Sequence, residues 1–336
     1  MMYRKYKKIK SFMENDIDSR SILIVGDVML DKYYFGEVRR ISPEAPVPIT
    51  RVTEEKETLG GAANVAHNLA LLGCKTMLVG TVGNDGHRSG LLRLLTATGI
   101  LHDGLIVGTA PTTTKLRVIG GHQQMIRLDF EETSPINQDT EDQIKKYMEN
   151  VLSEPIHCVI ISDYAKGVCT PALCRFIIKN CEKYNIPVIV DPKGNDWHKY
   201  TGASYITPNL KELNEAVHSP VANVDEEVKW AAQRIRRKYQ VKNLVVTRSE
   251  QGLSLIGARR CVHIPTHAQE VFDVSGAGDT VIAVLGAAIA AGLDPSDAAY
   301  LANLAAGIVV GKLGTYAISR EELLQTLEKN QILTEG

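Results

Sequence analysis

Short apolar runs, rich in β-branched residues, alternate with longer stretches of helical periodicity along most of the chain. Strands are expected at residues 22–25, 76–79, 159–162, 188–190, 205–207 and 244–247. Helices are expected between them at residues 62–72, 138–152, 171–184, 226–239 and 278–291. This alternation predicts an α/β fold in which a central, mostly parallel sheet carries helices on both faces. Since no Pro- or Ser-rich linker interrupts the pattern, we expect one domain over residues 21–330.

Two segments break the alternation and predict a second, smaller β-sheet. Residues 33–58 are strand-like and contain three prolines, and residues 112–129 form two strand-like runs around Gly120-Gly121. A Gly-Gly pair readily adopts the positive φ angles of a tight hairpin. The small sheet could be a lid over a cleft, or it could be an edge extension or dimer surface. The pattern does not decide between these two interpretations.

Composition and charge indicate a protein with a packed core and argue against some classes of partner. The chain has 336 residues, of which 44% are hydrophobic and 23% are charged, values typical of a protein with a packed core. Its 38 Lys and Arg residues and 39 Asp and Glu residues leave a net charge of -1. We therefore expect neither nucleic acid nor a membrane as a partner. The longest apolar run, residues 281–293, is also shorter than the roughly 20 residues of a membrane span.

The amino terminus and the cysteines indicate the compartment. Residues 1–20 are basic at first and then acidic, with no apolar segment of the kind that a secretory signal requires. We expect a flexible leader there, with a local anion or partner contact as the alternative. The six cysteines include no CxxC pair, which favours reduced, structural thiols in a cytoplasmic protein.

Polar residues follow five of the expected strands. They are Gly26-Asp27, Asp163-Tyr164, Asp191-Pro192-Lys193, Pro208-Asn209 and Arg248-Ser249. The carboxyl ends of parallel strands lie at one edge of a sheet, where ligands bind, so these residues should surround one crevice. A single such residue is more often a helix cap or a turn residue. Five together favour an enzyme that acts on a polar ligand.

The sharpest local signal is the sequence DVSGAGD at residues 273–279, directly before an apolar helix. Gly276 and Gly278 allow tight turns, and the unpaired N–H groups at the start of the helix can bind an anion. Asp279 could take a proton from a hydroxyl that attacks a phosphorus atom held there. The alternative is that Asp279 only caps the helix and the glycines only permit close packing.

Two further motifs contain candidate ligands. Gly60, Gly61 and Asn64 open a helix, where small residues admit a ligand and an amide can bind sugar hydroxyls. Asn209 and Glu212 lie one helical turn apart, so both could meet a hydrated magnesium ion and its phosphates. A glycine turn and an ordinary helix cap, respectively, are the alternatives.

In chain order these segments resemble the ribokinase, or PfkB, family of carbohydrate kinases, over residues 21–322. Motifs at residues 26–31, 40–48, 124–132, 162–167, 247–252 and 310–315 resemble one branch of it, the D-glycero-D-manno-heptose-7-phosphate kinases. The resemblance implies a ribokinase-like fold with a β lid at residues 33–58 and 112–129. It also implies transfer of the ATP γ-phosphate to the anomeric hydroxyl of the heptose phosphate, for ADP-heptose and lipopolysaccharide inner-core synthesis. A kinase of another phosphosugar, such as fructose 6-phosphate, and a non-catalytic nucleotide- or sugar-sensing protein are the alternatives.

The resemblance also implies residue roles. Asp279 would be the catalytic base, with an anion hole formed by Gly276, Ala277 and Gly278. Asn209 and Glu212 would act through magnesium, Glu212 through a water molecule. The nucleotide pocket would contain Thr247, Ser249, Gly252 and Asn303, the last near the adenine. Sugar hydroxyls would bind to Asp27, Asp31, Gly60, Gly61 and Asn64.

Some expectations from the resemblance stay open. The substrate phosphate needs a cation, for which the candidates are Arg127, Lys166 and Lys193; Lys193 could instead face ATP. Val274 occupies a position where the family usually has Thr, so the resemblance does not decide whether a potassium ion binds beside Asp273. Lid strands of the family often pair between subunits, which predicts a homodimer. No HxGH motif occurs, so we expect a stand-alone kinase without the adenylyltransferase domain that many bacteria fuse to it.

Overall fold

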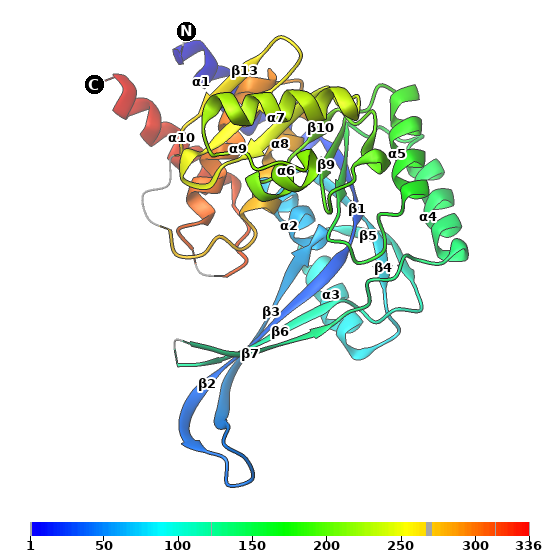
Figure 1. Cartoon of the computed structure of the whole chain (residues 1–336), viewed down its shortest axis with the longest axis vertical. Coiled ribbons are helices and arrows are strands. Elements are labelled where there is room, and N and C mark those ends of the chain that lie inside the picture. Colours follow the sequence, from blue (N-terminus) through cyan, green and yellow to red (C-terminus); the bar gives the residue numbers. More distant parts are fainter. Residues whose placement is uncertain (1, 122, 267–270, 313, 336) are drawn as a thin grey trace.

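The computed structural model describes residues 2–121, 123–266, 271–312 and 314–335, so residue 313 of the 310–315 motif lies outside the described part. Its main sheet has nine strands in the order β13-β12-β11-β10-β9-β8-β1-β4-β5 (Figure 1). From one edge to the other these are Cys261–Ile264 (β13), Leu253–Ile256 (β12), Asn243–Thr247 (β11), Tyr205–Ile206 (β10), Val188–Asp191 (β9), Cys158–Ser162 (β8), Ser21–Gly26 (β1), Lys75–Val82 (β4) and Leu101–Val107 (β5). All neighbours pair in parallel except at β12, which is antiparallel to both β11 and β13.

Helices cover both faces of this sheet. They are Ala62–Leu72 (α2), Gly86–Ala97 (α3), Gln138–Val151 (α4), Pro171–Lys183 (α5), Leu210–Val217 (α6), Asp225–Lys238 (α7), Ala277–Ala290 (α8), Pro295–Val309 (α9) and Arg320–Glu335 (α10). Successive residues of β1 point to opposite sides: Ile22 and Ile24 join the core under α2, α8 and α9, whereas Leu23 and Val25 join the core under α4, α5 and α7. A strand buried on both faces must be apolar throughout, as β1 is. The predicted α/β architecture is confirmed.

A second sheet of four strands, in the order β3-β2-β6-β7, projects from the main body (Figure 1). Its strands are Val28–Ile41 (β2), Pro48–Gly61 (β3), Thr114–Gly120 (β6) and Gln123–Phe130 (β7). Strands β2 and β3 overlap the first segment that breaks the helix–strand alternation, residues 33–58, and β6 and β7 overlap the second, residues 112–129. Strand β2 begins two residues after β1 ends, so the small sheet is connected directly to the carboxyl edge of the large one.

The amino-terminal segment differs from the expected flexible leader. It forms a helix, Met2–Ser11 (α1), followed by two short helical turns, Phe12–Asp16 and Ile17–Ser19. Ile9, Phe12, Met13 and Ile17 are fully buried in the core that also contains α9. These apolar residues recur at helical spacing and form one buried stripe, a pattern that the many lysines before it obscured. None of the helices in the described part is both long enough and apolar enough to cross a bilayer.

Candidate active site

The sheet register brings the polar strand ends together. Gly26 pairs with Ser162, and Ser162 pairs with Asp191, so the residues that follow β1, β8 and β9 are neighbours. The backbone N–H of Asp27 donates to the Ser162 carbonyl at 3.1 Å, and an isolated bridge joins Asn209 to Thr247. The predicted crevice edge is therefore continuous from β1 to β11.

The glycine-rich turn before α8 has the form that an anion site requires. Gly276 adopts a left-handed conformation with φ of 80°, and a Cβ atom there would lie 3.0 Å from Nδ2 of Asn64. Asp273 stabilises the turn by accepting N–H bonds from Ser275 at 2.9 Å and from Gly314 at 3.0 Å. Gly276 has no side chain with which to cap α8, and the N–H of Ala277 donates to the Val274 carbonyl at 3.2 Å. The N–H groups of Gly276 and Gly278 have no acceptor among the described residues, so they are the ones left for a ligand.

Asp279, in the first turn of α8, lies among polar side chains from distant parts of the chain. Its Oδ2 accepts a hydrogen bond from Nδ2 of Asn64 at 2.7 Å, and its Oδ1 accepts one from the Tyr164 hydroxyl at 2.6 Å. Burial raises the pKa of Asp279 to about 6, against the downward effect of these two bonds, and the nearby charge of Asp31 adds to the rise. A carboxylate with this pKa is ionised at neutral pH and still basic enough to accept a proton.

Asp31 occupies the same cluster. Nη1 of Arg117 donates to its Oδ1 at 2.6 Å, and a Cβ atom on Gly60 would lie 2.5 Å from its Oδ2. Gly61 is equally constrained, since its φ is 54° and a Cβ atom would meet the carbonyl oxygen of Asp27. The structure therefore groups Asp31, Gly60, Gly61 and Asn64 with Asp279, as predicted from segments far apart in the sequence.

Asp27 has a structural role in addition to the predicted sugar-binding one. It is buried, and its two carboxylate oxygens accept N–H bonds from the backbone of Tyr164 at 2.8 Å, Lys166 at 3.0 Å and Val168 at 3.1 Å. Asp27 therefore holds the loop after β8 in place, a role that the sequence does not reveal because the donors are backbone groups. Sugar binding by Asp27 stays a prediction.

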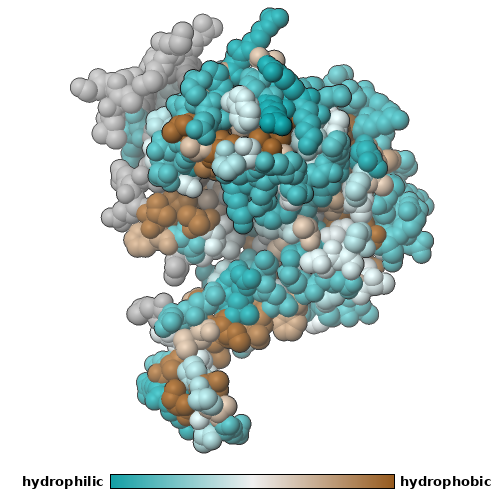
Figure 2. Space-filling model, in the orientation of Figure 1, coloured by the Kyte–Doolittle hydropathy of each residue, from teal (hydrophilic) through white to brown (hydrophobic). Residues whose placement is uncertain are grey.

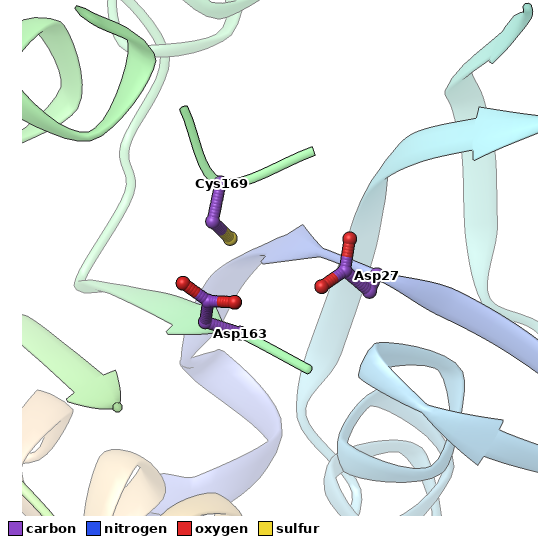
Figure 3. A group of neighbouring side chains, drawn as sticks. All are labelled: Asp27, Asp163 and Cys169. Carbon is purple, nitrogen blue, oxygen red and sulfur yellow. The ribbon is translucent and has the colours of Figure 1, made fainter. Parts of the chain in front are cut away.

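Asp27, Asp163 and Cys169 have ligand atoms within 4.8 Å of one another, as a metal site would (Figure 3). The donor set does not fit a cation, however. Asp163 already accepts hydrogen bonds from the Lys199 ammonium group and the Tyr200 hydroxyl, as well as from the backbone of Ala165. The Lys199 ammonium group supplies the positive charge that a metal would bring. This group of side chains is therefore structural.

A cavity of about 570 Å³ lies beside the glycine turn. The residues predicted for the nucleotide pocket line it together, namely Thr247, Ser249, Gly252 and Asn303, and so does Asn209. Ala277 and Gly278 of the turn also line it, whereas the carboxylate of the next residue, Asp279, is bound by Asn64 and Tyr164. The turn thus borders the cavity and leads directly into the carboxylate cluster.

The Asn209 and Glu212 pair forms the helix cap that the sequence left open as an alternative. Oδ1 of Asn209 accepts from the Glu212 backbone at 2.8 Å, and Oε2 of Glu212 accepts from the Asn209 backbone at 3.0 Å. The remaining oxygen of Glu212 meets Nζ of Lys193 at 3.1 Å. Burial, together with the charges of Glu212 and Asp279, raises the pKa of Asp191 well above its ordinary value. Since both oxygens of Glu212 have hydrogen-bond donors, a magnesium ion held at Glu212 stays a prediction.

The three predicted phosphate-binding cations have different environments. Lys193 lies beside Glu212, Lys166 pairs with Glu131 at 2.7 Å, and Arg127 makes a two-point contact with Asp129 on its own strand. Arg127 stands directly opposite Arg117 in the β6–β7 pairing, so the two side chains share one face of the small sheet. Sequence reasoning missed two residues of the cluster, Arg117 and Thr315, the second of which approaches Asp31 at 3.5 Å. It expected Tyr164 at the crevice but assigned it no role. The alternation of basic residues at 115 and 117 is the one signal that could have indicated Arg117.

Comparison with known proteins identifies the class. The family described as pfkB family carbohydrate kinase matches residues 19–322, and the chain belongs to this family. Bifunctional protein HldE of Methylobacillus flagellatus is 45% identical over 311 residues, which cover 92% of this chain and 64% of that protein. Bifunctional protein HldE of Proteus mirabilis is 44% identical over 320 residues, which cover 92% of this chain and 64% of that protein. The chain thus spans less than two thirds of the length of these curated relatives.

Solved structures show the same fold. Phosphofructokinase-2 from Escherichia coli, in complex with substrates and products, has a TM-score of 0.75 and 20% identity, over 92% of this chain and 99% of that one. Ribokinase from Thermotoga maritima has a TM-score of 0.70 and 23% identity, over 92% of this chain and 99% of that one. The predicted membership of the PfkB family and the predicted ribokinase-like fold are both confirmed.

Proposed function

We propose that this protein is an ATP-dependent sugar kinase that phosphorylates the anomeric hydroxyl of D-glycero-D-manno-heptose 7-phosphate and forms the 1,7-bisphosphate. One observation carries the proposal. A buried, basic carboxylate, that of Asp279, directly follows the glycine-rich residues at the start of α8, and those residues line a cavity large enough for a nucleotide. The 45% identity to proteins named HldE, together with the heptose-kinase motifs of the sequence, supports the heptose phosphate as substrate.

In the proposed reaction, the sugar hydroxyl gives its proton to Asp279 while the hydroxyl oxygen attacks the γ-phosphorus of ATP. The bond from that phosphorus to the oxygen bridging it to the β-phosphate breaks, and ADP leaves. The N–H groups of Gly276, Ala277 and Gly278 would stabilise the charge that develops on the phosphoryl oxygens. Asp31, Asn64 and the backbone at Gly60 and Gly61 would bind the sugar hydroxyls, with Asp27 fixing the adjacent loop.

Magnesium would be held near Glu212, with Asn209 beside it, and would neutralise charge on the triphosphate. Lys193 contacts Glu212, so we assign it to the nucleotide side of the site rather than to the sugar phosphate. Arg127 and Arg117, on the face of the small sheet that also carries Asp31, are then the cations best placed to bind the phosphate of the sugar. A monovalent ion beside Asp273 stays a prediction.

The small sheet also supports the proposed homodimer. Ile126, Leu128 and Phe130 alternate along β7 on the face opposite Arg127, and each is between 41% and 51% exposed. Figure 2 shows apolar side chains gathered on the projecting sheet. Exposed apolar side chains at alternating positions of one sheet face suit a partner strand or sheet. Sedimentation velocity should give a dimer, and Leu128→Glu should give a monomer; a wild-type monomer would contradict this proposal.

The assay that tests the substrate is turnover of ATP with a panel of phosphosugars. Heptose 7-phosphate should be preferred over fructose 6-phosphate and tagatose 6-phosphate in kcat/KM, and preference for a hexose phosphate would overturn the assignment. Asp279→Asn tests the class of protein. Its turnover should fall at least about a hundredfold, the lower end for loss of a general base, while ATP binding by calorimetry is retained. Unchanged turnover would mean that another residue is the base.

A further inference from the structure

Tyr164, which the sequence places at the crevice without a specific role, directly contacts the proposed base. Its hydroxyl donates to Oδ1 of Asp279 at 2.6 Å, a short bond typical of donation to a charged oxygen. Burial, followed by the charge of Asp279, raises the pKa of Tyr164 well above its ordinary value of 10. The hydroxyl therefore keeps its proton at any pH at which the enzyme would work, and it always acts as the donor.

The loop that carries Tyr164 is held by two buried carboxylates. Asp27 accepts the backbone N–H groups of Tyr164, Lys166 and Val168, and Asp163 accepts that of Ala165. Ala165 has a φ of 56°, a left-handed conformation that a residue with a side chain adopts only when its surroundings enforce it. This loop is thus fixed at the position that brings one hydroxyl to one carboxylate oxygen.

We infer that Tyr164 is a positioning residue that orients the Asp279 carboxylate toward the sugar hydroxyl and keeps it ionised; this inference rests on the proposed function. Asn64 binds Oδ2 and Tyr164 binds Oδ1, so the plane of the carboxylate is fixed by one donor on each oxygen. Each oxygen retains a further lone pair, and one of these can accept the substrate proton.

The surrounding charges explain why such donors are needed. Asp279 is one of the charges that raise the pKa of Asp191 at the end of β9. Asp31 on β2 in turn acts on Asp279 as a like charge and disfavours its ionised form. The guanidinium group of Arg117 is bound to Asp31 and offsets part of that effect. The hydrogen bonds from Asn64 and Tyr164 favour the ionised form directly, against burial. Without the Tyr164 hydroxyl, the pKa of Asp279 should therefore lie above about 6.

The test is the pH dependence of kcat/KM for the sugar phosphate in Tyr164→Phe. The acidic limb should move upward by about one to two pH units, the effect expected from losing a hydrogen bond to a charged group. The matched control is Tyr239→Phe, which removes a buried hydroxyl that has no hydrogen-bond partner among the described residues. Its profile should overlie that of the wild type. The substrate phosphate titrates alike in every variant, so only the difference between profiles counts.

A second variant keeps the inference testable if Tyr164→Phe does not fold. Site-specific replacement of Tyr164 by 3-fluorotyrosine preserves the shape and makes the hydroxyl a stronger donor, so the acidic limb should move downward. An unmoved limb in the fluorinated protein, or a limb that does not rise in a folded Tyr164→Phe, would overturn the inference. Asp279→Asn separates this outcome from failure of the proposed function. If Asp279→Asn is inactive while the Tyr164 variants keep the wild-type profile, the base assignment stands and only the role of Tyr164 is wrong.

Discussion

The replacement Asp279→Asn should change the stability of the protein in a pH-dependent way that can be calculated from the structure. Burial raises the pKa of Asp279 from an ordinary 3.8 to about 6 in the folded state. The folded protein thus holds this proton at pH values where the unfolded chain has already lost it. Stability therefore falls as the pH rises from about 4 to about 6, and the full cost is present above pH 6. Asparagine has no charge to bury and lacks this cost.

The size of the effect follows from the shift. A rise from 3.8 to about 6 corresponds to about 3 kcal/mol, since one pKa unit is worth about 1.36 kcal/mol. Part of that cost is already present at pH 5, because the unfolded carboxyl is mostly ionised there. The free energy of unfolding of Asp279→Asn relative to wild type should therefore increase by roughly 1 to 2 kcal/mol between pH 5 and pH 7.5. Any pH-independent effect of the amide cancels in this comparison.

Urea unfolding of both proteins at the two pH values measures this change. The control is Asp85→Asn at the start of α3. Burial acts upward on the pKa of Asp85, but N–H donors from Thr112, Arg88 and His87 outweigh it and hold that pKa below its ordinary value. Its titration thus lies below pH 5, and the stability difference of Asp85→Asn should stay flat over the tested range. The reasoning would be refuted if the free energy of unfolding of Asp279→Asn relative to wild type did not change between the two pH values, or if it decreased toward pH 7.5.

Three other substitutions test separate parts of the structure. Phe12→Ala should lower the free energy of unfolding by about 3 to 5 kcal/mol, because the side chain is fully buried, while kcat is unchanged; a flexible leader would show no loss of stability. Gly60→Ala places a Cβ atom 2.5 Å from Oδ2 of Asp31 and should raise the KM of the sugar more than the KM of ATP. Equal increases in the two KM values would contradict a sugar site at Gly60. Arg248→Met removes a buried guanidinium that ties Asn223 to the loop lining the nucleotide cavity. It should raise the KM of ATP about tenfold, the loss of one charged hydrogen bond, and a rise in the KM of the sugar instead would contradict this.

The parts of the fold that follow local rules were predictable from the sequence. The strand 22–25 and the helix 62–72 match β1 and α2 because an uninterrupted apolar run and a helical apolar stripe each select one kind of element. The leader was not predictable in the same way. Its helix is stabilised by packing against distant helices and by ion pairs such as Lys10 with Glu328, and such partners leave no local pattern.

In the candidate site, too, the residues that follow local rules could be predicted and those placed by distant contacts could not. The turn at Gly276 could be predicted because its left-handed φ and its close approach to Asn64 both require glycine there. Arg117 and Tyr164 could not, since an arginine on a strand and a tyrosine after one are common surface residues. Only the pairing of β2 with β6, and the position of the loop after β8, bring them to Asp31 and Asp279.

Asp27 shows why strand-end carboxylates cannot be sorted by sequence. Asp27 and Asp279 are both buried acids at the same sheet edge, and burial raises the pKa of each. They differ in their donors: Asp27 accepts three backbone N–H groups, whereas the donors to Asp279 among the described residues are the side chains of Asn64 and Tyr164. Every residue except proline supplies a backbone N–H, so the sequence does not distinguish a carboxylate bound by backbone groups from one that is available to a substrate. Under the proposed function, a carboxylate with one donor on each oxygen has more capacity for a substrate proton than one that accepts three N–H groups, and this difference supports Asp279 as the base.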